Sequence, residues 1–120
     1  MAKKKSAKGK GAEAWRAAAL SYPETVEVDS CNKKAFKARD KSFLFLGVRD
    51  TDYNIMVRLG DSRGEAEKMA AKDPDNISVG PHWITATFAS TQALPAGLIR
   101  RWIDESWRLL APKKLVASLD

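Results

Sequence analysis

Apolar and polar side chains alternate along several stretches of this 120-residue chain. Successive side chains of an extended strand point to opposite faces, so a period of two marks a half-buried strand. The stretch from Tyr53 to Leu59 follows this pattern, with its odd positions apolar or aromatic and expected to face inward. The stretch from Trp83 to Ala89 follows it too, with positions 84, 86 and 88 on one face and positions 83, 85 and 87 on the other. Both patterns predict antiparallel strands with one solvated face.

Three other stretches show the helical period of 3.6. The first runs from Gly11 to Tyr22, and the second runs from Arg63 to Lys72. The third begins at or near Pro95, a residue that suits the first helical position, and it has the longest apolar stripe. That stripe comprises Leu98, Ile99, Trp102, Ile103, Ser106, Leu109 and Leu110. Pro112 is expected to break this helix, and residues 113–119 are expected to add a further helical turn or two.

The predicted elements follow one another in the order helix, strands, helix, strands, helix. Helices laid on one face of a mostly antiparallel sheet would bury all of these apolar stripes. We therefore predict an α+β fold, a two-layer sandwich with its helices on one face of the sheet. A chain of this length favours a single domain with one modest core, here residues 11–120, and we expect a monomer.

A basic strand precedes a strongly apolar one between Lys33 and Val48. On an extended chain Lys37 and Arg39 would lie on one face, and Phe36 would lie on the other together with Ala38. We place the connection at residues 40–41, after which an apolar strand begins at residue 42. Two strands joined by two residues predict a β-hairpin, and we expect this hairpin to be the working surface of the protein.

The formal net charge of +6 is distributed unevenly along the sequence. Residues 1–10 hold five lysines and no acid, whereas residues 11–120 hold 16 basic and 15 acidic residues and are nearly neutral. Within them, residues 33–41 hold five basic residues and one acid. Residues 1–10 lack large apolar side chains, so we expect a disordered, Lys-rich tail. This tail would either add non-specific phosphate contacts or serve only as a solubilising terminus, added for expression or native.

Composition and motifs narrow the class of protein. Cys31 is the only cysteine, which rules out an internal disulfide and favours a reducing compartment, so we expect a cytoplasmic protein. No apolar run approaches the ~18 residues of a membrane helix. His82 is the only histidine, and neither a G-x-S-x-G elbow nor a phosphate-binding glycine loop occurs. We therefore expect no enzymatic activity, no metal site and no cofactor.

Five stretches of the sequence are similar to one family. They are residues 19–24 with Glu27, residues 35–43, residues 57–59, residues 80–84 and residues 102–115. On these stretches, which span about residues 14–117, the chain resembles the MmcQ/YjbR family of small bacterial proteins. The resemblance implies a frataxin-like α+β fold with two projecting, wing-like hairpins, a general description as DNA-binding, and no shared catalytic residues.

The basic hairpin and the resemblance together predict a nucleic-acid-binding surface. Its candidate residues are Lys33, Lys34, Lys37, Arg39, Lys41, Arg58 and Trp83. Neutralising about four phosphates would give a salt slope of roughly −3.6, which describes weak, salt-sensitive binding to DNA.

Three alternatives remain beside this prediction. In the first alternative, the lysines bind no ligand and form a solvated face that protects a sheet edge from pairing with another chain. Trp83 would either stack on an exposed base or pack against a neighbouring strand. The hairpin would otherwise dock onto an acidic protein partner, which makes the domain a protein-interaction module.

Overall fold

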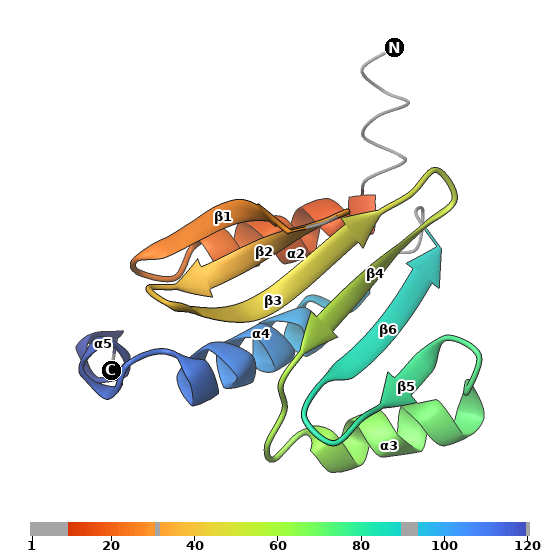
Figure 1. Ribbon diagram of the computed structural model, residues 1–120. Helices are drawn as coiled ribbons and strands as arrows, with labels where there is room; N and C mark the ends of the chain where they lie inside the picture. Colours follow the sequence, from red (N-terminus) through yellow and green to blue (C-terminus); the bar gives the residue numbers. More distant parts are fainter. Residues whose placement is uncertain (1–9, 31, 90–93, 120) are drawn as a thin grey trace.

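The computed structural model describes residues 10–30, 32–89 and 94–119. Within these residues six strands form one antiparallel sheet, in the order β1-β2-β3-β4-β6-β5 (Figure 1). The strands are β1 (Thr25–Ser30), β2 (Lys33–Ala38), β3 (Lys41–Val48), β4 (Asp52–Val57), β5 (Ile77–Val79) and β6 (Ile84–Ala89). The helices are α2 (Lys10–Leu20), α3 (Arg63–Lys72), α4 (Ala96–Leu110) and α5 (Lys113–Leu119). The predicted α+β fold is confirmed.

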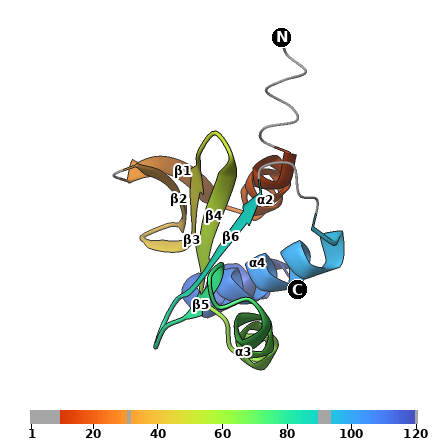
Figure 2. The same ribbon diagram turned by 90° about the vertical axis from the view of Figure 1, so that its right-hand side faces the viewer.

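Helices α2 and α4 pack on one face of the sheet, and α3 packs beside β5 (Figure 2). The alternation in the sequence explains this arrangement. Phe36, Leu44, Val57 and Ile84 lie in one row across four strands, and all four are fully buried in the core between the layers. The apolar stripe of α4 supplies Trp102 and Ile103 to the same core, as its helical period predicts. The prediction was wrong at the end of the helix, where Leu109, expected in the stripe, is 53% exposed, and Trp107, left out of it, is fully buried.

The β2–β3 hairpin differs from its prediction in two details. Its connection is Arg39-Asp40, because Ala38 pairs with Lys41, so β3 begins one residue before the predicted position 42. Arg39 has φ 59° and belongs to the turn, not to the basic strand. A bulge between residues 36 and 37 then leaves Phe43 without a partner in β2, which allows Phe43 and Leu44, adjacent in sequence, both to be buried.

Ser106 joins α4 to the sheet. Its side chain is fully buried, donates a hydrogen bond to the carbonyl of Phe43 at 2.5 Å and accepts one from the backbone N–H of Arg58 at 3.0 Å. Both backbone groups lie outside the strand ladders, so this hydroxyl satisfies them where water has no access.

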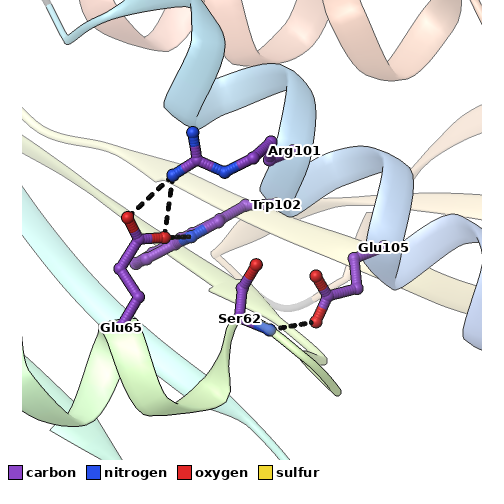
Figure 3. A network of polar contacts seen from close by, with 5 residues as sticks. All are labelled: Ser62, Glu65, Arg101, Trp102 and Glu105. Carbon is purple, nitrogen blue, oxygen red and sulfur yellow. Dashed lines mark hydrogen bonds and ion pairs between the residues drawn. The ribbon is translucent and has the colours of Figure 1, made fainter.

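Polar contacts join α3 to α4 (Figure 3). The Arg101 guanidinium donates to both carboxylate oxygens of Glu65, at 2.9 and 2.7 Å, and the Trp102 indole N–H donates to Glu65 Oε1 at 3.1 Å. Glu105 of α4 accepts hydrogen bonds from the backbone N–H groups of Gly60 and Ser62. A carboxylate of α4 therefore satisfies N–H groups just before α3, where a side-chain cap from Ser62 itself is missing.

Of the predicted disordered tail, residues 1–9 lie outside the described residues, as does Cys31. Lys10, which the prediction included in the tail, is the first residue of α2.

Candidate nucleic-acid interface

The sheet face opposite α2 and α4 carries no helix of the described residues, and we call it the open face. Strand alternation and register identify its side chains. One row runs from Val28 through Ala35, Phe45 and Met56 to Thr85. The other members are Val26, Ser30, Lys33, Lys37, Ser42, Gly47, Asp52, Asn54, Ser78, Thr87, Ala89 and, just before β6, Trp83.

The same alternation separates opposite charges at the β1–β2 hairpin. Glu27 pairs in register with Phe36 and faces the helices, where it accepts a hydrogen bond from Arg16 of α2 at 3.0 Å. Asp29 lies on the same side of β1. On the open face the alternation places one carboxylate among the described residues, Asp52, at one end of β4, where Arg49 binds it at 2.8 Å. The middle of the open face therefore carries basic side chains without acidic neighbours.

Lys33 and Lys37 supply the positive charge of the open face. The ammonium of Lys33 reaches across β3 to the sulfur of Met56 in β4, at 3.6 Å. Lys37 forms no ion pair with any residue that the structure describes. Both side chains are half-buried, so their methylene stems cover apolar surface while the charged ends remain in water.

Two aromatic rings lie beside these lysines. Phe45 of β3 and Trp83 contact each other edge-to-face, with ring centroids 5.5 Å apart and an interplanar angle of 68°. Trp83 thus packs across β4 onto a side chain of β3, whereas the alternative predicted from the sequence was packing on an adjacent strand. Both residues remain partly exposed, so part of their surface is accessible to a flat ligand.

Two other candidate residues are bound to acids away from the open face. Lys34 alternates to the helix side of β2 and forms an ion pair with Asp29, which raises the pKa of Lys34. Arg39 donates two hydrogen bonds from the turn to Glu24, at 2.8 and 3.2 Å, and these hold the pKa of Glu24 below its usual value. The two pairs are exposed and contribute little to stability, but they reduce the charge available to a polyanion.

The last two basic candidates lie elsewhere again. Lys41, at the start of β3, and Arg58, just after β4, line a pocket beside the end of α4 together with Arg63 and His82. The structure therefore divides the seven candidate residues among the open face, the two ion pairs and this pocket. It does not bring them together on one strand face.

A sequence model of the YjbR family matches residues 20–109, which is well over half of the chain. The chain belongs to the YjbR family. A crystal structure of the Deinococcus radiodurans protein DR2400, a DUF419 domain, superimposes on it with a TM-score of 0.62. That protein is 17% identical, and the match covers 82% of this chain and 77% of the other, so the comparison shows a shared fold. No curated protein matches the sequence.

Within the described residues of this YjbR domain, no group of three or more His, Cys, Asp or Glu side chains is arranged to hold a metal ion. The acidic residues that precede the hairpin pair with different cations instead. Glu24 binds Arg39, Glu27 binds Arg16, and Asp29 binds Lys34. None of the described helices is long and apolar enough to cross a bilayer.

Sequence reasoning missed several members of the YjbR open face and the pocket. Phe45 was assigned only to an apolar strand, because residues 43–46 are all apolar and give no alternation from which its face could be predicted. Met56 was expected to face outward, and the structure agrees, but nothing in the sequence linked it to Lys33. Arg63 reads as the first residue of a helix, and only the folded chain brings it near Arg58.

Proposed function

We propose that this YjbR domain is a non-enzymatic module that binds nucleic acid through its open face. Lys33 and Lys37 would contact phosphates, and the exposed surfaces of Phe45 and Trp83 would contact bases. One observation carries the proposal: strand alternation directs Glu27 and Asp29 to the helix side and both lysines, beside an aromatic pair, to the uncovered side.

The geometry favours single-stranded over duplex ligands. A sheet face with partly exposed aromatic rings suits unpaired bases, whose flat surfaces are free to stack or pack on them. Each stacked base is worth about 1–3 kcal/mol, whereas two phosphate contacts alone give a salt slope of only about −1.8 for duplex DNA and less for a single strand. We therefore propose weak binding with little sequence preference, in the reducing cytoplasm that a single cysteine favours.

A protein partner is the second candidate. Val26 and Val28 are 51% and 39% exposed on the open face, and they belong to β1, an edge strand whose outer side pairs with no described strand. An exposed edge with apolar side chains can accept a further strand from another chain. An acidic partner would be the one favoured by Lys33 and Lys37.

Charge reversal tests the nucleic-acid proposal. The variant Lys33→Glu/Lys37→Glu changes the open face, and the matched control Lys68→Glu/Lys114→Glu makes the same change in net charge on exposed residues of α3 and α5. We expect the open-face variant to bind labelled single strands of DNA or RNA about tenfold more weakly, and the control to change affinity by less than about threefold at the same salt. Fluorescence anisotropy over a salt series measures both.

Equal losses in the two variants would contradict the proposal, because they would show attraction to net charge without a site. A partner retained after nuclease treatment, and lost with Lys33→Glu/Lys37→Glu, would instead favour the protein-binding candidate.

A further inference from the structure

The pocket beside the end of α4 has a volume of about 280 Å3. It is bounded by the start of β3, the end of β4, the first residue of α3, the turn before β6 and the last turn of α4. Its basic lining residues are Lys41, Arg58, Arg63 and His82, and its apolar wall includes Leu59 and Leu109. These positions are far apart in the sequence and meet only in the folded chain.

This pocket differs from the other hollows of the described residues because its charged lining residues are all basic. Four larger hollows in the described residues each have at least one carboxylate in their lining. No acidic residue lines the pocket of Arg58 and Arg63. Basic groups gathered around a concave surface repel each other when the space is empty, and an anion bound there would relieve this repulsion.

The basic side chains differ in how far they are already neutralised. Arg63 lies 3.5 Å from the carboxylate of Glu67, which is mostly exposed, and donates a hydrogen bond to the carbonyl of Gly80 at 2.6 Å. Arg58 and Lys41 form no ion pair with any residue within the described ranges. At least two cations therefore retain their full charge for a ligand.

The backbone positions these groups before any ligand arrives. The N–H of Arg58 is fixed by Ser106, and the turn that carries His82 is closed by a hydrogen bond from the N–H of Gly80 to the carbonyl of Trp83, at 2.9 Å. The hydrogen bond from Arg63 to Gly80 ties this turn to α3. Less conformational freedom is lost on binding when the donors are held in this way.

We propose that this pocket binds a phosphate group. Two guanidinium groups offer paired N–H donors that match the oxygens of a phosphate, with Lys41 and His82 at the exposed rim. The volume lies just below the usual range for small-molecule sites, so it suits a phosphomonoester and its first attached atoms more than a whole nucleotide. The inference does not rest on the open face, which uses other residues.

Titration with inorganic phosphate at constant ionic strength, followed by the backbone amide signals in NMR, tests the proposal. We expect saturable shifts concentrated at Gly60, Arg63 and His82. The variant Arg58→Gln should weaken this binding about tenfold, in line with the loss of a charge-assisted hydrogen bond, and the matched control Arg100→Gln on the exposed side of α4 should change it by less than about twofold. Lys41→Gln, at the rim, gives a second variant if Arg58→Gln does not fold.

Shifts that fail to saturate, or an equal effect of Arg100→Gln, would overturn the proposal. The variant Lys33→Glu/Lys37→Glu should still bind phosphate, which makes failure of the pocket distinguishable from failure of the open face.

The source of the phosphate is resolved with two further probes. Tighter binding of a 5′-phosphorylated oligonucleotide than of its 5′-hydroxyl form, removed by Arg58→Gln, would assign the pocket to strand ends. Binding of ribose 5-phosphate that depends on Arg58, with no gain from strand phosphorylation, would assign it to small phosphorylated metabolites. If Arg58→Gln changes the binding of neither the 5′-phosphorylated oligonucleotide nor ribose 5-phosphate, the ligand is not a phosphomonoester.

Discussion

Single residues of the core are packed closely enough for one methyl group to matter, and Gly11 is the sharpest case. A Cβ atom at this position of α2 would lie 2.4 Å from the hydroxyl and 2.6 Å from the ring of Tyr53, which is fully buried. We predict that Gly11→Ala lowers the free energy of unfolding by about 1–3 kcal/mol through overpacking, although alanine is the better helix former by about 1 kcal/mol. Urea denaturation measures the change.

Gly64 in α3 provides the matched control, since a Cβ there would have no neighbour within 4 Å. Gly64→Ala should leave stability unchanged or raise it by up to about 1 kcal/mol, because only helix propensity changes. A stabilising effect of Gly11→Ala would show that the Tyr53 ring can move aside, contrary to the prediction.

At this scale the sequence predicts which side chains are buried better than it predicts what they contact. The stripe of the last helix correctly included Ser106, but its partners lie 63 and 48 residues away, at Phe43 and Arg58. The same holds for the pair of Arg39 and Glu24, 15 residues apart. Sequence periodicity predicts burial because buried positions recur with the period of the helix or strand. A hydrogen bond between distant segments has no such period, so the sequence pattern does not indicate it.

Among the elements, α3 depends on polar contacts more than the other long helices do, because Ala66 is its one fully buried side chain within the described residues. Hydrogen bonds from Arg101, and then from Trp102, hold the pKa of Glu65 below its usual value. The folded state therefore favours ionised Glu65. Its contribution to stability is fully present above the ordinary pKa of about 4.5 and is lost as the pH falls through the lower pKa of the folded state.

We predict that Glu65→Gln destabilises the domain at neutral pH and that its deficit relative to the wild type narrows as the pH falls below about 4. Urea denaturation at a series of pH values between about 7 and 3 measures this difference. Glu67→Gln is the control on the same helix, since its contact with Arg63 is 3.5 Å and exposed, and it should cost little at any pH. A deficit for Glu65→Gln that stays constant with pH would contradict the prediction.

The elements themselves were predictable because each has an unbroken pattern. The helices beginning near residues 11, 63 and 95 and the strands near residues 53 and 84 follow clean periods and were predicted within a few residues. The hairpin was predicted as a hairpin but with its connection one residue late. The bulge at Phe43 allows two adjacent apolar residues, Phe43 and Leu44, to be buried on the same face. The local sequence pattern cannot distinguish a strand with this bulge from a strand whose turn is shifted by one residue.

At the scale of the whole molecule, the sheet separates the acids of β1 from the two lysines of the open face. Glu27 and Asp29 lie on the helix side, where Glu27 pairs with Arg16 of α2, whereas Lys33 and Lys37 lie on the opposite face. The sequence predicted the two layers, since every apolar stripe needs a partner surface. The sequence could not predict which basic residues share a surface. The turn lies one residue earlier than predicted, so Arg39 belongs to the turn and not to the strand, and Lys41 lies beside the pocket.

The Lys-rich start of the chain provides the last prediction. A chain that begins at Lys10 keeps the first residue of α2 but lacks Lys3, Lys4, Lys5 and Lys8, so its formal net charge falls from +6 to +2. We expect weaker binding to single-stranded DNA and a shallower salt slope, by up to about 0.7 for each lost phosphate contact. Fluorescence anisotropy over a salt series, comparing the full and shortened chains, measures both.

The decisive comparison combines this deletion with the open-face variant. If the folded domain binds the nucleic acid, Lys33→Glu/Lys37→Glu must still weaken binding in the shortened chain, because those lysines remain on the sheet whatever precedes α2. The loss from the deletion and the loss from the substitution should then add in free energy, as they do for distant, independent sites. Complete loss of binding on deletion alone, even at low salt, would assign the affinity to the lysines of the first nine residues and remove the open face from consideration.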